Sequence, residues 1–227
     1  MPVHLFDRQQ LPATPWKNGG GVTREIVCQP PGAGMDAFDW RVSIAHIASD
    51  GPFSRFEQVD RVITLLEGAG VRLHSHDGAV DHRLDRPWEP FAFPGEAPVQ
   101  GDLIAGDCHD FNVMTRRGRC RAQVVVVREA VSLPPTDAGL LMVLAGHWQL
   151  AGASNAPRDA TAPSAHVPEG RRADQGADTD ANTGVTWTLA THHGLWWHDG
   201  GGPVHLRPAV QHGLAALLAV SIEWEHA

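Results

Sequence analysis

Short segments in which apolar and polar residues alternate recur along the chain. Residues 38–47 (FDWRVSIAHI) place Trp40, Val42 and Ile44 on one side of a strand and the intervening residues on the other. Six more short segments are rich in β-branched or aromatic residues and are bounded by Gly, Pro, Asp or Asn: 61–66, 71–74, 110–114, 123–127, 140–144 and 186–190. This pattern predicts an all-β protein.

Helix signals are few. The best candidate is 208–218, which offers a proline for a first helical turn but carries Gly213 in its middle. The chain also contains 24 glycines and 17 prolines, which punctuate the predicted strands. One or two barrels with few short helices are therefore favoured over a helical or βαβ architecture.

A weak internal repeat indicates two barrels. The sequences VITLLEGAGVR and LLMVLAGHWQL each have an apolar run followed by a glycine, Gly68 in the first and Gly146 in the second. We predict an N-terminal barrel, residues 1–130, that carries the ligand pocket, and a second, degenerate barrel, residues 131–227. The second barrel includes a segment, 151–184, without Leu, Ile, Met, Phe or Trp, which predicts a disordered insertion.

Composition narrows the classes of partner. The net charge is −8 and the acidic residues are spread along the chain, so a nucleic-acid-binding surface is not expected. No window reaches the roughly 18 to 20 consecutive apolar residues of a membrane span, and no leader pattern opens the chain. We therefore expect a cytoplasmic protein with no membrane partner. Cys28, Cys108 and Cys120 are widely spaced, which predicts reduced thiols.

The densest cluster of candidate functional residues is 16–21 (WKNGGG). A strand-like alternation follows it and no Gly-Lys-Ser/Thr is present, which argues against a nucleotide-binding loop. Lys17 is the single lysine among 18 basic residues. Two interpretations stay open: Lys17 and Asn18 bind an anionic or amide-bearing ligand beside the glycine backbone, or the segment is an ordinary turn.

A second cluster surrounds Arg61. In metal-binding cupin barrels, which this segment resembles, a His-x-His pair precedes a glutamate, and a glycine follows that glutamate by seven residues. Counting back from Gly68 places Arg61 in the glutamate position, and no histidine occupies the two preceding ligand positions. We therefore expect neither metal nor other cofactor, and a guanidinium in place of the metal. The nearby His74 and His76 are interpreted as part of a solvated hairpin.

Five motifs, in this order, resemble the HutD/Ves family: WKNGGGVTREI, FDWRVSIAHI, DGPFSRF, DRVITLLEGAG and DFNVMTRRG. The match runs from Trp16 to Gly118. The resemblance implies a cupin-type double barrel, that is, a bicupin with RmlC-like jelly-roll barrels. It also implies an association with histidine utilisation, binding of an intermediate such as N-formylglutamate or urocanate, and moderation of pathway induction.

A metal-independent pocket for a small carboxylate agrees with both the residues and the resemblance. Cations, hydrogen-bonding groups and aromatic walls suit such an anion. The predicted ligand-binding residues are Trp16, Lys17, Asn18, Gly19, Ser43, Phe53, Phe56, Arg61, Asp110 and Asn112. We predict no catalytic residue. The expected partner is the carboxylate, and the protein assembly to consider is a homodimer.

Two other functions stay open. A cofactor-free enzyme, an isomerase or amidohydrolase, would use Lys17 or His109 as general base, with burial beside Arg61 lowering the pKa of the lysine. A structural cupin would use its charged residues for salt bridges at the barrel mouth. Formate release from N-formylglutamate would identify the enzyme, and thermal stabilisation by no carboxylate would favour the structural role.

Overall fold

A computed structural model describes residues 2–152, 185–209 and 213–225 of the chain. Strands dominate these residues, and the helices among them are the short η1 (Arg8–Gln10) and α1 (Gly34–Ala37). The expected all-β architecture with few short helices is confirmed. The insertion predicted at 151–184 lies almost entirely outside the described residues. Within the described ranges, no helix is both long enough and apolar enough to cross a bilayer.

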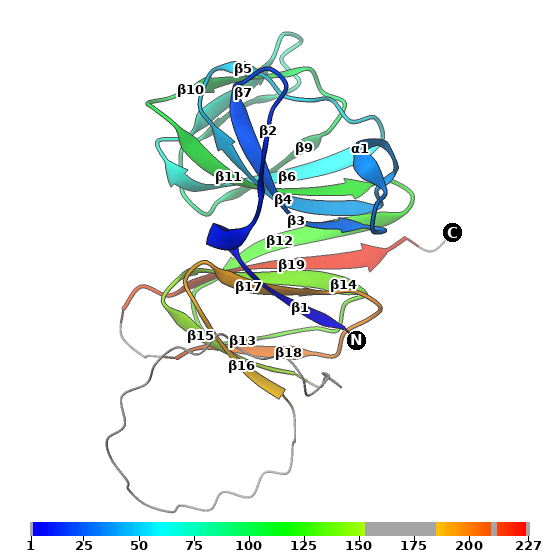
Figure 1. The fold of residues 1–227 in the computed structure, drawn as a ribbon, viewed down its shortest axis with the longest axis vertical. Helices are drawn as coiled ribbons and strands as arrows, with labels where there is room; N and C mark the ends of the chain where they lie inside the picture. Colours follow the sequence, from blue (N-terminus) through cyan, green and yellow to red (C-terminus); the bar gives the residue numbers. More distant parts are fainter. Residues whose placement is uncertain (1, 153–184, 210–212, 226–227) are drawn as a thin grey trace, which may run out of the picture.

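The strands form two barrels, each built from two facing sheets (Figure 1). In the first barrel, a six-stranded sheet has the order β2 (Ala13–Pro15), β3 (Gly21–Gln29), β4 (Trp40–Ile47), β11 (Cys108–Arg116), β6 (Val59–Gly68) and β9 (Pro90–Pro94). It faces a four-stranded sheet with the order β5 (Gly51–Pro52), β10 (Val99–Leu103), β7 (Val71–Ser75) and β8 (Asp81–Leu84).

The second barrel repeats this arrangement. Its five-stranded sheet has the order β1 (Val3–Asp7), β17 (His193–Trp197), β14 (Ala138–Ala145), β19 (Ala216–Trp224) and β12 (Cys120–Val127). Its four-stranded sheet has the order β13 (Val131–Leu133), β18 (Val204–Pro208), β15 (His147–Gly152) and β16 (Val185–Ala190).

The two barrels are copies of one topology. The strand order β4-β11-β6-β9 in the first matches β12-β19-β14-β17 in the second, and β5-β10-β7-β8 matches β13-β18-β15-β16, with a constant offset of eight strands. Gly68 is the last residue of β6, and Gly146 comes directly after β14. Both have a positive φ, 95° at Gly68 and 77° at Gly146. A turn in the left-handed region favours glycine, which explains the repeat seen in the sequence.

Alternation along the strands separates three large apolar cores, and a smaller cluster contains Phe38, Val59 and Met114. Inside the first barrel lies a core that includes Ile63, Leu73 and Val99, and inside the second lies one that includes Trp148 and Leu217. A third core, which we name the inter-barrel core, joins the two large sheets and contains the buried residues Trp40, Val42, Ile44, Phe111, Val113, Leu140 and Val220, among others. The barrels are therefore held face to face by the outer surfaces of their larger sheets.

Two expectations about element placement need correction. Strands β1 and β12 both precede residue 130, yet they pair with β17 and β19 in the sheet of the second barrel, so a boundary at 130 does not follow the strand pairing. The candidate helix at 208–218 is not found at its described ends, because Pro208 ends strand β18 and Ala216–Trp224 is strand β19, paired with β12 and β14; residues 210–212 lie outside the described residues. The apolar run of β19 faces a core on both sides, which produces a pattern that resembles a buried helix.

Candidate functional site

Polar side chains line the interior of the first barrel on three adjacent strands. Successive strand residues point to opposite faces of a sheet. On β11, Phe111 and Val113 therefore enter the inter-barrel core, while Asp110 and Asn112 point into the barrel together with Cys108. These residues pair with interior residues of β4 and β6. The outcome is a buried polar cluster, which we define as Arg41, Ser43, Arg61, Asp110 and Asn112.

Arg61, on β6, is the central cation of the polar cluster. It is 5% exposed, and burial lowers the pKa of its guanidinium to about 10, so it remains charged at neutral pH. Its Nε donates to Asn112 Oδ1 at 3.4 Å and one Nη donates to the Ser54 carbonyl at 3.3 Å. No carboxylate of the described residues forms an ion pair with it, which leaves a buried positive charge without a negative partner in contact.

Three aromatic rings surround the Arg61 guanidinium. Its central carbon lies 4.9 Å from the ring centre of Phe93, 5.4 Å from that of Phe53 and 5.7 Å from that of Phe56. Phe53 and Phe56 are half-buried and belong to the segment between β5 and β6. Stacking of this kind favours a cation and restricts its rotation. Two of the three predicted aromatic residues, Phe53 and Phe56, are therefore beside the predicted arginine.

Asp110 is the acid of the polar cluster. It is fully buried, and neither carboxyl oxygen has a hydrogen-bond partner among the described residues. Desolvation raises the pKa of Asp110 from 3.8 to about 7, although the nearby Arg61 charge acts in the opposite direction. A buried acceptor without a hydrogen-bond partner is costly and unusual in a folded protein, and the Arg61 charge and the Asn112 side chain are the groups that lower the pKa of Asp110 against its burial.

Arg41, on β4, is a second buried guanidinium that the sequence analysis did not select. Its Nε donates to Glu25 Oε2 at 2.7 Å and one Nη donates to Ser43 Oγ at 3.1 Å. Met114 lies between the two arginines, because it pairs with Arg41 on one side and with Arg61 on the other. The signal was present in the sequence, since alternation places Arg41 on the same strand face as Ser43.

The loop at residues 16–21 lies at the surface of the first barrel. Trp16 is half-buried and packs against the interior core, with its indole Nε1 donating to Thr23 Oγ1 at 2.7 Å. Lys17, Asn18 and Gly19 are exposed. A general-base role for Lys17 requires the lysine to be buried beside Arg61. Because Lys17 is exposed, the structure does not provide that burial.

Two glycines of this loop have distinct structural roles. Gly19 has a φ of 74°, and a Cβ on Gly21 would lie 2.2 Å from the His46 carbonyl oxygen. The backbone amide of Gly20 donates to Asn18 Oδ1 at 3.0 Å. The glycine run thus forms a tight turn, which is one of the two interpretations of the cluster.

Histidines lie outside the polar cluster. His109 stacks on His46 with ring centres 4.6 Å apart, on the opposite face of the sheet from Asp110. His74 lies at the end of β7 and contacts Asp102 Oδ2 at 2.8 Å, while His76 is exposed. In the described part of the chain, no group of three or more His, Cys, Asp or Glu side chains is arranged to hold a metal ion.

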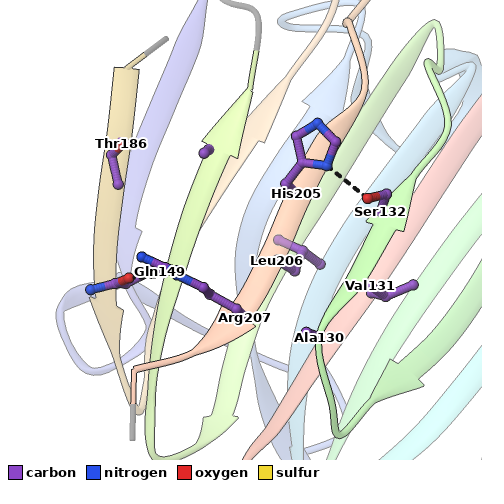
Figure 2. Close-up of a pocket in the computed structure, with 9 residues that line it drawn as sticks. Ala130, Val131, Ser132, Gln149, Thr186, His205, Leu206 and Arg207 are labelled. Atoms are coloured by element: carbon purple, nitrogen blue, oxygen red, sulfur yellow. Dashed lines mark hydrogen bonds between the residues drawn. The ribbon is translucent and has the colours of Figure 1, made fainter. Parts of the chain in front are cut away.

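A pocket of about 470 Å³ lies on the second barrel, on the face of the β13-β18-β15-β16 sheet that turns away from the core. Figure 2 shows its lining, with Ser132 Oγ 2.7 Å from His205 Nδ1. Arg207 donates to Gln149 Oε1 at 2.8 Å. Four of its polar side chains thus form two pairs, Ser132 with His205 and Arg207 with Gln149, and among its lining residues there is no buried charge comparable to Arg61.

Comparison with solved structures defines the class. Oxalate decarboxylase from Bacillus subtilis, 7% identical, aligns with a TM-score of 0.60 over 98% of this chain and 78% of that chain, a likeness of fold alone. Together with the duplicated strand order, this makes the protein a bicupin.

The family follows from the sequence. The HutD family model matches residues 8–212, so the chain belongs to the HutD family. HutD from Pseudomonas fluorescens SBW25 is 25% identical, with a TM-score of 0.71 over 99% of this chain and 100% of that chain. Protein Ves from Cronobacter sakazakii is 47% identical over 149 residues, which are 65% of this chain and 80% of the relative.

Proposed function

We propose that the first barrel binds a small carboxylate without a metal ion. The observation that carries this proposal is Arg61, a buried guanidinium stacked among aromatic rings and without a carboxylate in contact. A guanidinium presents a planar set of N–H donors that matches the two oxygens of a carboxylate. Asn112 and Ser43, which are buried beside it, add groups that donate and accept hydrogen bonds.

The proposed ligand is an intermediate of histidine degradation, such as N-formylglutamate or urocanate, and the proposed role is to sense that intermediate and moderate pathway induction. Membership of the HutD family supports the pathway. The structure of HutD from Pseudomonas fluorescens was determined in a formate condition, and formate is the smallest carboxylate. The exposed Lys17 and Asn18 would contact the part of the ligand that projects toward the surface.

Isothermal titration calorimetry with formate, N-formylglutamate and urocanate tests the proposal. The Arg61→Ala variant should bind the tightest of these more weakly by about 2 to 5 kcal/mol, because a buried carboxylate would lose its counter-charge. Arg55→Ala is the matched control, since Arg55 is an exposed arginine of the same segment. Wild-type affinity in Arg61→Ala, or no binding to the folded wild-type protein, would contradict the proposal.

The same samples distinguish a sensor from an enzyme. After incubation with N-formylglutamate, a sensor leaves the compound intact, whereas an amidohydrolase releases formate and glutamate. We expect the compound to be recovered unchanged, as measured by proton NMR. Stoichiometric formate release that disappears in Arg61→Ala would replace the sensor role with a catalytic one.

A further inference from the structure

The polar cluster contains an acid and a cation that share a buried space without touching. Neither an ion pair within 4.0 Å nor a hydrogen bond joins Asp110 to Arg61, yet the charge of each shifts the pKa of the other. Both are buried, and although Arg61 pairs with Met114 and Asp110 with Leu65, the Arg61 side chain reaches along β11 to donate to Asn112, the interior residue next to Asp110. A ligand carboxylate placed on Arg61 would therefore come close to a second carboxyl group that has no other partner.

One guanidinium neutralises one carboxylate. If Asp110 stayed ionised, the bound ligand would create a second negative charge in a buried environment, where like charges at short distance cannot both persist. Protonation removes the repulsion and converts Asp110 into a donor. Its O–H then donates to a ligand carboxylate oxygen while Arg61 donates to the same carboxylate, and both orphaned groups become satisfied.

We propose that Asp110 takes up one proton when a carboxylate binds at Arg61, so that the first barrel binds an anion and a proton together. This inference rests on the proposed function and specifies its chemistry. The proton comes from solvent or buffer and forms the O–H bond of the Asp110 carboxyl group, while no covalent bond of the ligand changes. Binding is therefore strongest where the proton is already present and weakens as the pH rises above neutrality, by up to about tenfold per pH unit.

The other groups that face Asp110 do not provide an alternative proton site between pH 7 and 9. On the same strand, burial raises the pKa of the Cys108 thiol to about 12, so the thiol stays neutral. On β6 and β4 the charged groups are Arg61 and Arg41, and Arg41 is paired with Glu25 of β3. The facing sheet contributes apolar residues of the interior core: Val71, Leu73, Leu84 and Val99.

The histidine pair on the opposite face of the sheet is the remaining titratable neighbour. Burial and His46 lower the pKa of His109 from its ordinary value of 6.5, and both rings lie on the face directed away from Asp110. The His109 ring is therefore neutral at pH 8, where the proton uptake is counted.

The proton can be counted directly. Calorimetric titration of the whole protein with formate and with N-formylglutamate at pH 8, in phosphate and in Tris, gives the number of protons taken up from the dependence of the heat on buffer. We expect close to one proton per carboxylate in the wild-type protein and close to none at pH 5.5. Asp110→Asn should take up none at pH 8 and should bind with nearly constant affinity from pH 6 to 9.

Asp107→Asn is the matched control, because Asp107 is an exposed carboxylate three residues earlier, and it should retain the wild-type proton count. If Asp110→Asn does not fold, the wild-type count at pH 8 decides alone. Binding without proton uptake overturns this inference and leaves the proposed function intact. Failure of the folded wild-type protein to bind either carboxylate overturns both.

Discussion

The interiors of the two barrels differ although their topology is the same. Arg61 lies seven residues before Gly68, and the position seven residues before Gly146 is Gly139. On the adjacent strand, Asp110 pairs with Leu65 in the first barrel, where Leu217 pairs with Val143 in the second. By the same registers Asn112 corresponds to Ala219. Charged and amide side chains in one copy are thus replaced by glycine and apolar residues in the other.

The replacement also fills the space. Phe93 pairs with Arg61 in the first barrel, and Trp197 pairs with Gly139 in the second. A Cβ on Gly139 would lie 2.4 Å from the Trp197 ring, so the indole occupies the volume next to this glycine. The comparison teaches that the cupin scaffold itself does not require an interior charge. This difference agrees with the proposal that the charges of the first barrel serve a ligand.

The largest effect on stability should come from placing a carboxyl group in the second barrel, at the position equivalent to Asp110. Leu217→Asp would place a carboxyl group in an apolar core with no guanidinium beside it, and we expect a loss of about 3 to 5 kcal/mol of unfolding free energy at pH 8. Urea denaturation measures the loss. Leu217→Asn has the same shape without charge and should lose less. Equal losses for both variants would contradict the difference between the two interiors.

The pH dependence of stability in the absence of ligand should be carried by the first barrel. The pKa of folded Asp110 is about 7, above its ordinary value of 3.8, so the stability that its proton provides is complete below pH 4 and is lost as the pH rises to about 7. Each pKa unit of difference corresponds to about 1.4 kcal/mol. Asp110→Asn should therefore flatten the profile of urea midpoint against pH, whereas Asp107→Asn should not. Parallel profiles for Asp110→Asn and the wild-type protein would be the contrary result.

A smaller effect is expected from adding one carbon to the second barrel. Gly139→Ala brings a methyl group within 2.7 Å of the Val220 carbonyl oxygen as well as against Trp197, and overpacking of this kind costs about 1 to 3 kcal/mol. Thermal unfolding measures the cost. Gly51→Ala is the control, because a Cβ at Gly51 would meet a single atom 4.0 Å away. An unchanged Gly139→Ala variant would show that the indole can move aside.

The smallest effect concerns the second guanidinium of the first barrel. Glu25→Gln removes the carboxylate from Arg41, but the Glu25 side chain is 48% exposed and Ser43 still holds Arg41, so the loss should be about 1 kcal/mol or less. Chemical denaturation compares it with Glu57→Gln, which changes a more exposed glutamate. A loss above about 3 kcal/mol would contradict this expectation. It would show that Arg41 needs its ion pair with Glu25 in order to be buried, whereas Arg61 is buried without an ion pair among the described residues.

Much of the fold can be predicted from the sequence because local alternation controls it. Residues 38–47 alternate, and strand β4 lies within that segment. Its Trp40 is in the inter-barrel core and its Arg41 is inside the barrel. Arg61 was found by its spacing from Gly68, which is a property of one strand and one turn. These signals act over a few residues, so a single sequence contains them.

The errors concern relations between distant residues. The pairing of β1 and β12 with the second barrel depends on which edge is free in three dimensions, and alternation carries no information about the partner. The candidate helix at 208–218 overlapped the first residues of strand β19 because Leu217 and Leu218 are both buried, each in a different core. The exposure of Lys17 depends on the direction of a glycine turn, which residue types alone do not determine.

Strand β1 has a consequence for how the chain is made. Val3 pairs with Trp197, and β1 is an edge strand whose neighbour in the described sheet is β17. During synthesis on the ribosome, β1 therefore emerges long before β17 and stays unpaired until β17 has been translated. Contacts between such distant residues are slow to form. Residues Val3–Asp7 thus join their sheet late, and a nascent chain stopped before β17 leaves β1 as an unpaired strand on which other unfinished chains can aggregate.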